Sequence, residues 1–398
     1  MSDKIIPYGK QHITEEDIRV VIETLTSDYL TQGPKIAEFE TAFANYVGSK
    51  YAVAVANGTA ALHLCTLALE VSKGDKVITT PITFAASANC VRYCGGDIVF
   101  SDIDPETYLL DFEKTKALLE SSPIGTYSGI IPVDFAGNAV NLEKFKQLAD
   151  EYNLWMIEDA CHAPGGYFID SKGEKQLCGN GSFADLAIFS FHPVKHIASG
   201  EGGMITTNDL TLYNRLIQLR THGITKDDKL YSNTTSFASG VENDYYPNWY
   251  MEMQMLGYNY RLTDFQAALG NSQLERANDG LEKRKKIAKR YEKAFLEKQF
   301  IKGQSGVVDG HAYHLYVIEV ENRLGLYEYL REHKIFAQIH YIPCHLMPYY
   351  RALGWKENDM PLAEEYYRNC ISLPMYPTLS TDDQEFVISK INEFYQIK

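Results

Sequence analysis

The stretch that decides the fold is DLAIFSFHPVKHIASGEGGMITT, residues 185–207. The apolar run LAIFSF predicts a buried strand that ends near Ser190, and GGMITT predicts a second strand. Between them lie Lys195, with a proline and a valine before it, and a glycine-rich turn. Ligands of open α/β sheets bind beyond the carboxyl ends of the strands. We therefore expect Lys195 to lie at a binding site.

Similar short apolar runs occur on the N-terminal side of this stretch. They read YAVAVA (51–56), KVITT (76–80), DIVFSDI (97–103), GIIPVDF (129–135) and LWMIEDA (154–160), with helical patterns such as NLEKFKQLADEY between them. With the two runs around Lys195 they make seven predicted strands. Alternation of strands and helices over roughly 170 residues predicts a mostly parallel seven-stranded sheet with helices on both faces, in the α/β class.

Two helices are expected before the first strand, one over EEDIRVVIETL, capped by Thr14, and one over a segment that ends at Gly48. The chain after the last strand predicts a second, smaller domain. Residues 221–258 are polar and tyrosine-rich and predict a long loop or an insertion. A long helical stretch follows at 264–295, then an α+β region whose last helix opens with a capping-box pattern at Thr381–Gln384. We expect a large domain at 1–265 and a small C-terminal domain at 266–398.

Composition excludes several classes of protein. The 398 residues carry a formal net charge of −14, which argues against a general surface for nucleic acid or anionic membrane. No run approaches 18 apolar residues, and the opening MSDKIIPYGKQ has no apolar stretch of a signal peptide. The seven cysteines form no CxxC pair, which predicts reduced thiols, no disulfide framework and no metal site. A cytoplasmic protein is expected.

Polar or reactive residues follow several of the predicted strands. Gly58-Thr59-Ala60 opens a helix whose free amides suit a phosphate, although an ordinary capped helix has the same pattern. Asp159 ends a buried strand, where it suits a pyridinium nitrogen or caps the next helix. Phe84 suits a stacking role or plain core. Lys195 has apolar neighbours that favour a desolvated, nucleophilic amine over a solvated surface lysine. Together these signals favour a cofactor site.

With these motifs the chain resembles the DegT/DnrJ/EryC1/StrS family of sugar aminotransferases, which use pyridoxal 5'-phosphate and have the type I fold of these enzymes. The similarity covers nearly the whole chain, and its motifs include ANGTAALHL, PITFAASANC, EDACHA, SFHPVK, GEGG and LGYNYRLTDFQAALG. The YGKQ opening, the PITFAASANC run and the His-Pro-Val before the lysine resemble members that act in pseudaminic acid biosynthesis.

The resemblance implies roles for residues around the cofactor. Lys195 is expected to bind the cofactor covalently and then to move the proton of the reaction. Asp159 is expected to pair with the pyridine nitrogen, His162 to lie near the ring hydroxyl, and Phe84 to stack on the ring. The residues expected to hold the phosphate are Thr59, Ala60, Ser190 and, from a partner subunit, Asn259.

The resemblance also implies a substrate and an assembly. The expected reaction moves an amino group from L-glutamate to the C4 ketone of a UDP-linked 4-keto-6-deoxy-N-acetylhexosamine, in a homodimer with shared active sites. Arg261 is a candidate for contact with the nucleotide diphosphate. The candidates that line the sugar-nucleotide cleft are His314, Tyr316 and His345.

Several alternatives stay open at this point. Another UDP- or dTDP-linked keto sugar would suit the same motifs, and a non-catalytic regulator that binds the cofactor would share the fold. A nicotinamide-dependent sugar reductase is disfavoured because no GxGxxG follows the first strand. A dehydratase of the family is disfavoured because Lys195 stands where dehydratases have histidine.

Overall fold

A seven-stranded sheet forms the centre of the large domain in the computed structural model, which describes residues 5–296, 298–303 and 308–396. The strand order is β2-β10-β9-β6-β5-β3-β4. β10 runs antiparallel to both of its neighbours, and the other neighbouring strands pair in parallel. The strands are β2 (Tyr51–Val55), β3 (Lys76–Thr79), β4 (Asp97–Phe100), β5 (Gly129–Ile131), β6 (Trp155–Asp159), β9 (Leu186–Ser190) and β10 (Gly203–Thr207). The predicted mostly parallel, seven-stranded sheet is confirmed.

Alternate residues of the strands enter two different hydrophobic cores, because successive side chains of a strand point to opposite faces. In β9, Ile188 joins the core shared with the helices that follow β2 and β3, whereas Phe189 joins the core that includes the helix at residues 34–47. Both side chains are fully buried. Burial on both faces explains why these strands are continuous apolar runs.

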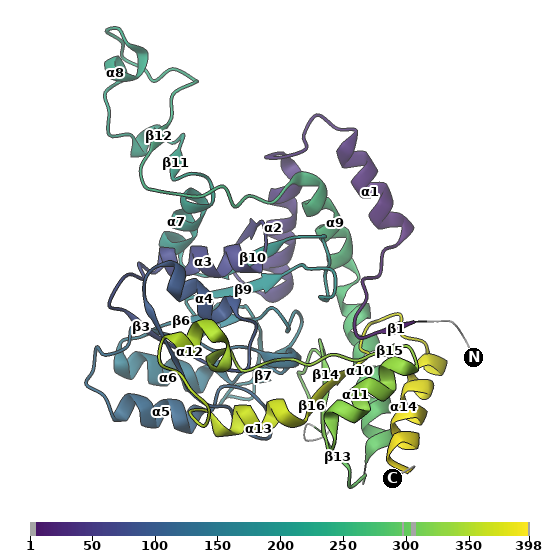
Figure 1. The fold of residues 1–398 in the computed structure, drawn as a ribbon. Coiled ribbons are helices and arrows are strands. Elements are labelled where there is room, and N and C mark those ends of the chain that lie inside the picture. The colour runs from purple at the N-terminus through teal and green to yellow at the C-terminus, as the bar shows by residue number, and fades with distance from the viewer. Residues whose placement is uncertain (1–4, 297, 304–307, 397–398) are drawn as a thin grey trace.

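Helices cover both faces of the sheet and link it to the small domain (Figure 1). The helices up to residue 295 are α1 (Glu15–Leu25), α2 (Pro34–Val47), α3 (Gly58–Ala68), α4 (Ala86–Tyr93), α5 (Phe112–Glu120), α6 (Leu142–Tyr152), α7 (Leu210–Arg220), α8 (Thr235–Ser239), α9 (Asp264–Glu275) and α10 (Ala277–Phe295). The capping box at Thr14 and the end of α2 at Gly48, which has a φ of 82°, agree with the prediction.

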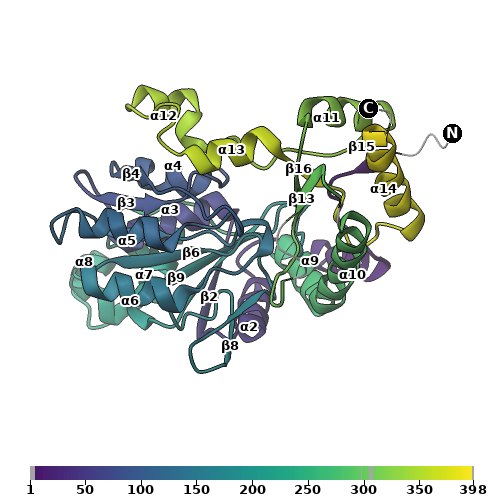
Figure 2. The ribbon, with the colours of Figure 1, turned by 90° about the horizontal axis from the view of Figure 1, so that it is seen from below.

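The small domain lies at one end of the molecule, and a single segment extends from it along the large domain (Figure 2). Its elements are β13 (Ile301–Gly303), β14 (Tyr316–Val320), α11 (Arg323–Glu332), β15 (Ile335–Phe336), α12 (Pro348–Ala352), α13 (Pro361–Asn369), β16 (Cys370–Leu373) and α14 (Thr381–Gln396). Its core includes Tyr291, Ile318 and Ile371. The short strand β1 (Ile6–Pro7) pairs with β15, so the N-terminal segment lies against the small domain.

Contacts cross the expected boundary at residue 265 in both directions. Ile6 packs in the small-domain core, and the backbone amide of Cys344 donates to Pro81 O at 2.8 Å. The amides of Leu362 and Ala363 donate to the carboxylate of Asp102 at 3.0 Å each. The division at residue 265 stays a prediction, and these hydrogen bonds hold the segment of α12 and α13 on the large domain.

Three local features differ from the sequence-based expectations. The long helical stretch is interrupted at Arg276, between α9 and α10. Ser380 rather than Thr381 caps α14, because its Oγ accepts from the amide of Asp383 at 3.1 Å and Thr381 is already helical. The hairpin of β7 (Tyr167–Ile169) and β8 (Lys175–Leu177) was not expected, since each strand has only three residues.

Residues 221–258 form an arm that projects from the large domain, where a long loop was expected (Figure 1). The arm contains β11 (Ile224–Thr225) and β12 (Glu252–Met253), which pair, and α8 near its tip. Glu252 holds it together by accepting from the amides of Ser232 and Asn233. No helix among the described ranges is long and apolar enough to cross a membrane.

Candidate active site

A cavity of about 760 Å³ lies beyond the carboxyl ends of the central strands. It collects residues that are far apart in the sequence, because strand ends of a parallel sheet meet at one edge. Eight of the predicted site residues line it, and they are Thr59, Ala60, Phe84, Asp159, His162, Ser190, Lys195 and His314. The volume falls within the range of small-molecule sites, roughly 300–1,000 Å³.

The N-terminus of α3 forms a phosphate cradle in this cavity. Asn57 caps the helix, and its Oδ1 accepts from the amide of Ala60 at 2.8 Å. The first intrahelical bond runs from the Ala61 amide to Asn57 O, which leaves the amides of Gly58 and Thr59 pointing out of the helix end. These two amides have no acceptor among the described residues, whereas the amide of Ala60 donates to Asn57; that Thr59 and Ala60 hold a phosphate stays a prediction.

Gly58 makes the cradle open enough for a ligand. A Cβ at position 58 would lie 3.1 Å from the Cβ of Ser190 and 3.5 Å from Cys161 Sγ. Any larger side chain would fill the space between the helix end and the hydroxyl of Ser190. The hydroxyls of Thr59 and Ser190 and the positive end of the helix dipole then suit a bound phosphate.

Asp159, the last residue of β6, is buried and held by hydrogen bonds. Ser87 donates its hydroxyl to Asp159 Oδ2 at 2.6 Å, and the amide of Cys161 donates to Oδ1 at 3.2 Å. Thr83 lies 2.8 Å from Ser87 Oγ, so a chain of hydroxyls from α4 and the loop before it leads to the carboxylate. A carboxylate stabilised in this way is suited to pairing with a positively charged ring nitrogen.

Lys195 lies five residues after the end of β9 and lines the same cavity as the phosphate cradle. Its backbone amide donates to His192 O at 2.8 Å, which closes the turn. Desolvation lowers the pKa of the Lys195 amine, while the nearby Cys161 and Asp159 act in the opposite direction. A lowered pKa makes an amine a better nucleophile and base near neutral pH.

His162 is neutral and has a defined tautomer. The amide of Ala136 donates to its Nδ1 at 3.2 Å, so the proton of the ring resides on Nε2. Nε2 lies 3.3 Å from the hydroxyl of Tyr341, and the His314 ring packs 4.3 Å away between centroids. Burial, and then the positive charge of Lys195, lowers the pKa of His162 well below its usual value. The Nε2–H group can therefore donate to an anionic oxygen.

Four predicted residues do not line the cavity. Tyr316 stacks on Tyr291 and donates its hydroxyl to Glu292 at 3.3 Å. His345 is buried against Glu364, with 3.1 Å between Nε2 and Oε1. Asn259 and Arg261 form backbone bridges to Thr221 and Val55, at the base of the arm. The expectation that Asn259 acts on a partner subunit stays a prediction.

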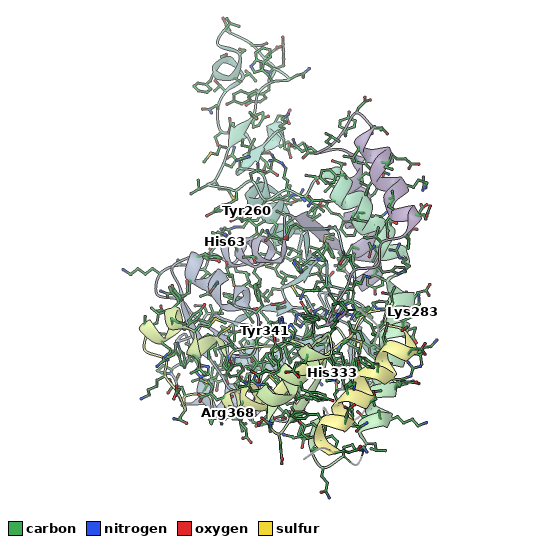
Figure 3. All side chains as sticks on the ribbon, turned by 45° about the vertical axis from the view of Figure 1, so that its right-hand side comes forward. His63, Tyr260, Lys283, His333, Tyr341 and Arg368 are labelled. Carbon is green, nitrogen blue, oxygen red and sulfur yellow. The ribbon has the colours of Figure 1, made fainter. Side chains whose placement is uncertain are left out.

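Several residues of the cavity were missed by the sequence analysis. Ser87 lies one helical turn after Phe84 in the same motif, which was an available signal. Tyr341 reaches the cavity from the small domain, and His63 and Tyr260 lie side by side on another wall, with 3.2 Å between Nδ1 and the hydroxyl. Figure 3 shows His63 next to Tyr260, with Tyr341 nearer the small domain.

These residues fit a flat cofactor that carries a phosphate. Phe84 is 61% exposed although it lines a cavity, so its ring face is available for stacking. The cradle supplies donors for the phosphate, Asp159 supplies a partner for a ring nitrogen, and the Nε2–H of His162 supplies a donor for a ring oxygen. An amine, that of Lys195, lies among them.

The fold and the cavity define an α/β protein in which a lysine lines a cavity beyond the end of a sheet strand. The model of the DegT/DnrJ/EryC1/StrS aminotransferase family matches residues 11–392, and the chain belongs to this family.

Known members of this family are similar over almost the whole chain. The chain is 36% identical to the UDP-4-amino-4,6-dideoxy-N-acetyl-beta-L-altrosamine transaminase of Campylobacter jejuni serotype O:23/36, over 96% of each protein. It is 33% identical to the GDP-perosamine synthase of Escherichia coli O157:H7, over 99% of this chain and 100% of the relative. The PLP-form structure of the Streptococcus pneumoniae sugar aminotransferase Spr1654 superposes with a TM-score of 0.85 and 27% identity, over 99% of each chain.

Proposed function

We propose that this protein is a sugar aminotransferase that uses pyridoxal 5'-phosphate to move an amino group from L-glutamate to the keto group of a nucleotide-linked sugar. The observation that carries the proposal is the convergence of Lys195, Asp159 and the α3 phosphate cradle in one cavity. Membership of the aminotransferase family and similarity to the PLP-form structure of Spr1654 support pyridoxal phosphate as the cofactor. A nicotinamide cofactor would need a GxGxxG phosphate loop after the first strand, and the sequence has none there.

The cofactor supplies an electron sink for the carbon that gains or loses the amino group. The chain's own residues do the rest. Gly58, Thr59 and Ser190 hold the phosphate, and Phe84 covers one face of the ring. The amine of Lys195, with its pKa lowered by desolvation, takes the proton from the donor carbon and later delivers a proton to the sugar carbon.

Asp159 and His162 tune the ring from two positions. The carboxylate of Asp159 keeps the ring nitrogen protonated, which strengthens the pull on electrons. His162 donates from Nε2 because the Ala136 amide already occupies Nδ1. Asp159 is the last residue of β6, and His162 lies three residues after it, so the sheet holds the two side chains at a constant spacing.

The proposed substrate is a UDP-linked 4-keto-6-deoxy-N-acetylhexosamine, aminated at C4 as in pseudaminic acid biosynthesis. The Campylobacter relative supports this substrate by its name, and the GDP-perosamine synthase, almost as similar, supports only the wider class of nucleotide sugars. Another UDP- or dTDP-keto sugar is the second candidate. A non-catalytic role is disfavoured by the intact Lys195 and Asp159.

A panel of nucleotide-linked keto sugars tests the substrate. The purified enzyme, loaded with pyridoxal phosphate and supplied with glutamate, is offered 4-keto and 3-keto sugars on UDP and dTDP. Mass detection of the aminated product is expected with the UDP-linked 4-keto-6-deoxy-N-acetylhexosamine at a higher kcat/KM than with the others. Preference for a 3-keto or a dTDP-linked sugar would contradict this substrate while leaving the aminotransferase assignment intact.

Replacement of Asn259 tests the proposal that the active site is shared between subunits. Asn259→Ala is expected to weaken cofactor affinity about 10- to 150-fold, because one hydrogen bond to a charged phosphate is worth about 1.5–3 kcal/mol. The side chain is exposed at the base of the arm, so the free energy of unfolding of one protomer should change little. Cofactor titration followed by absorbance gives the dissociation constant.

A mixing experiment separates a shared site from a local effect. In a hybrid of one Lys195→Ala chain and one Asn259→Ala chain, one site carries both changes and the other carries neither. At limiting cofactor the hybrid should therefore recover activity that neither variant shows alone. Absence of recovery in hybrids, or full activity of an isolated wild-type monomer, would contradict the shared site.

A further inference from the structure

Three buried side chains form a cluster behind Asp159 that the proposed reaction does not use. The carboxyls of Asp134 and Glu158 and the thiol of Cys178 are almost completely buried, and one ligand-type atom from each lies within 4.8 Å of the others. Glu158 precedes Asp159 on β6 but points to the opposite face of the sheet. The cluster therefore lies on the face of the sheet opposite to the side chain of Asp159.

Each carboxyl uses one oxygen for the backbone and leaves the other without a donor. Asp134 Oδ1 accepts from the amide of Val140 at 2.8 Å, and Glu158 Oε2 accepts from the amide of Gly179 at 2.9 Å. Asp134 Oδ2 and Glu158 Oε1 are buried and have no donor among the described residues. Two ionised carboxylates in this arrangement would repel each other, whereas one proton between them would satisfy both oxygens.

The loop that Asp134 closes holds two histidines of the cavity. Within residues 134–140, Ala136 has a left-handed φ of 60° and donates its amide to His162 Nδ1. The carbonyls of Ala136 and Gly137 accept from the amides of Leu315 and Ala312, on either side of His314. A Cβ on Gly137 would lie 2.8 Å from Tyr313 N, which shows how closely this loop packs on that segment.

We propose that Asp134 and Glu158 share one proton and, as a singly ionised pair, position the 134–140 loop and through it His162 and His314. Asp134 also donates its backbone amide to Asp159 O at 3.0 Å, so the same residue braces β6 at the cavity. The pair acts through other groups and touches no reacting atom. It is a positioning device rather than a catalytic one.

The sign of the pH dependence follows from the two carboxyls. Burial raises the pKa of both carboxyls, and the charge of Asp134 raises that of Glu158 further. The folded pair therefore holds a proton at a pH at which both carboxyls of the unfolded chain are ionised, and the stability that this proton contributes is lost as the pH rises through the raised pKa of the pair. The other titratable groups that face the pair are Cys178, Asp159 and, more distantly, Cys161.

Amide variants of the apoprotein test the shared proton without any cofactor. Glu158→Gln or Asp134→Asn supplies a permanent donor for the other carboxylate, so the pH-dependent fall in Tm above about pH 6 should be smaller by several degrees than in the wild type. The double variant places two NH₂ groups face to face and should unfold at a lower temperature than either single variant at about pH 6. Asp209→Asn, which changes one charge at an exposed helix cap, should keep the wild-type dependence on pH.

Spectroscopy of the wild type keeps the proposal falsifiable if the variants fold poorly. The infrared spectrum of the apoprotein at about pH 6 should contain the stretching band of a buried carboxylic acid, lost in the single variants. In the holoprotein, cofactor affinity should weaken at a higher pH in Glu158→Gln than in the wild type. The reason is that the amide keeps the 134–140 loop, and through it His162, in position at a pH at which the wild-type pair has lost its proton. Absence of the acid band, an unchanged pH dependence of Tm in both single variants, or one equivalent of metal that Cys178→Ser removes would overturn the shared proton.

Discussion

Replacement of Lys195 by alanine is expected to abolish amino transfer, with a loss of at least about 10⁴-fold in kcat, while the protein stays folded. The loss follows because the same amine is proposed to hold the cofactor and to move the proton. Folding should survive because the amine has no hydrogen bond or ion pair to any residue that the structure describes, so only a half-buried side chain is removed. Coupled detection of 2-oxoglutarate measures the loss.

Controls separate the role of this amine from damage to the site. Lys293→Ala, at an exposed position of α10, should keep wild-type turnover. Borohydride reduction should fix the cofactor to Lys195 of the wild type, detected as a modified peptide, and should leave the Lys195→Ala variant unlabelled. A small added amine should restore part of the proton transfer in that variant. Unimpaired transamination by Lys195→Ala, or labelling at another lysine, would contradict the assignment.

Local patterns in the sequence predicted the part of the site that lies on the sheet. The strand that ends at Ser190, the turn to Lys195 and the helix that opens at Gly58 each depend on a few neighbouring residues. Parallel strands bring their carboxyl ends to one edge whatever the loops do, so the strand assignments alone placed these residues together. The cavity confirms this placement.

The parts that could not be predicted depend on contacts between distant segments. Ser87 bonds to Asp159, 72 positions away, and the local pattern gives only its place on a helix. Tyr341 enters the cavity, and Tyr316 does not, because of how the small domain docks on the large one. The first turn of α3 shows the same limit, since Asn57 occupies the Ala60 amide that the motif left apparently free.

Asp159→Asn is expected to lower kcat by about 10³-fold and to leave the fold and the position of the side chain unchanged. The asparagine oxygen can still accept from the amide of Cys161, and its NH₂ group can donate to the hydroxyl of Ser87, which can accept as well as donate. What is lost is the negative charge that keeps the ring nitrogen of the cofactor protonated, and the pull on electrons weakens with it. Single-turnover kinetics with glutamate measure the chemical step directly.

A graded series distinguishes the charge of Asp159 from its hydrogen bonds. Ser87→Ala keeps the charge and removes one donor to it, so a smaller loss of about tenfold in kcat is expected, equivalent to about 1.4 kcal/mol. Asp209→Asn removes a charge far from the cavity and should have no effect on kcat. If Asp159→Asn and Ser87→Ala lowered kcat equally, orientation rather than charge would be the contribution of Asp159. A near-wild-type rate for Asp159→Asn would remove it from the catalytic groups altogether, because a neutral amide cannot stabilise a protonated ring nitrogen in a buried site.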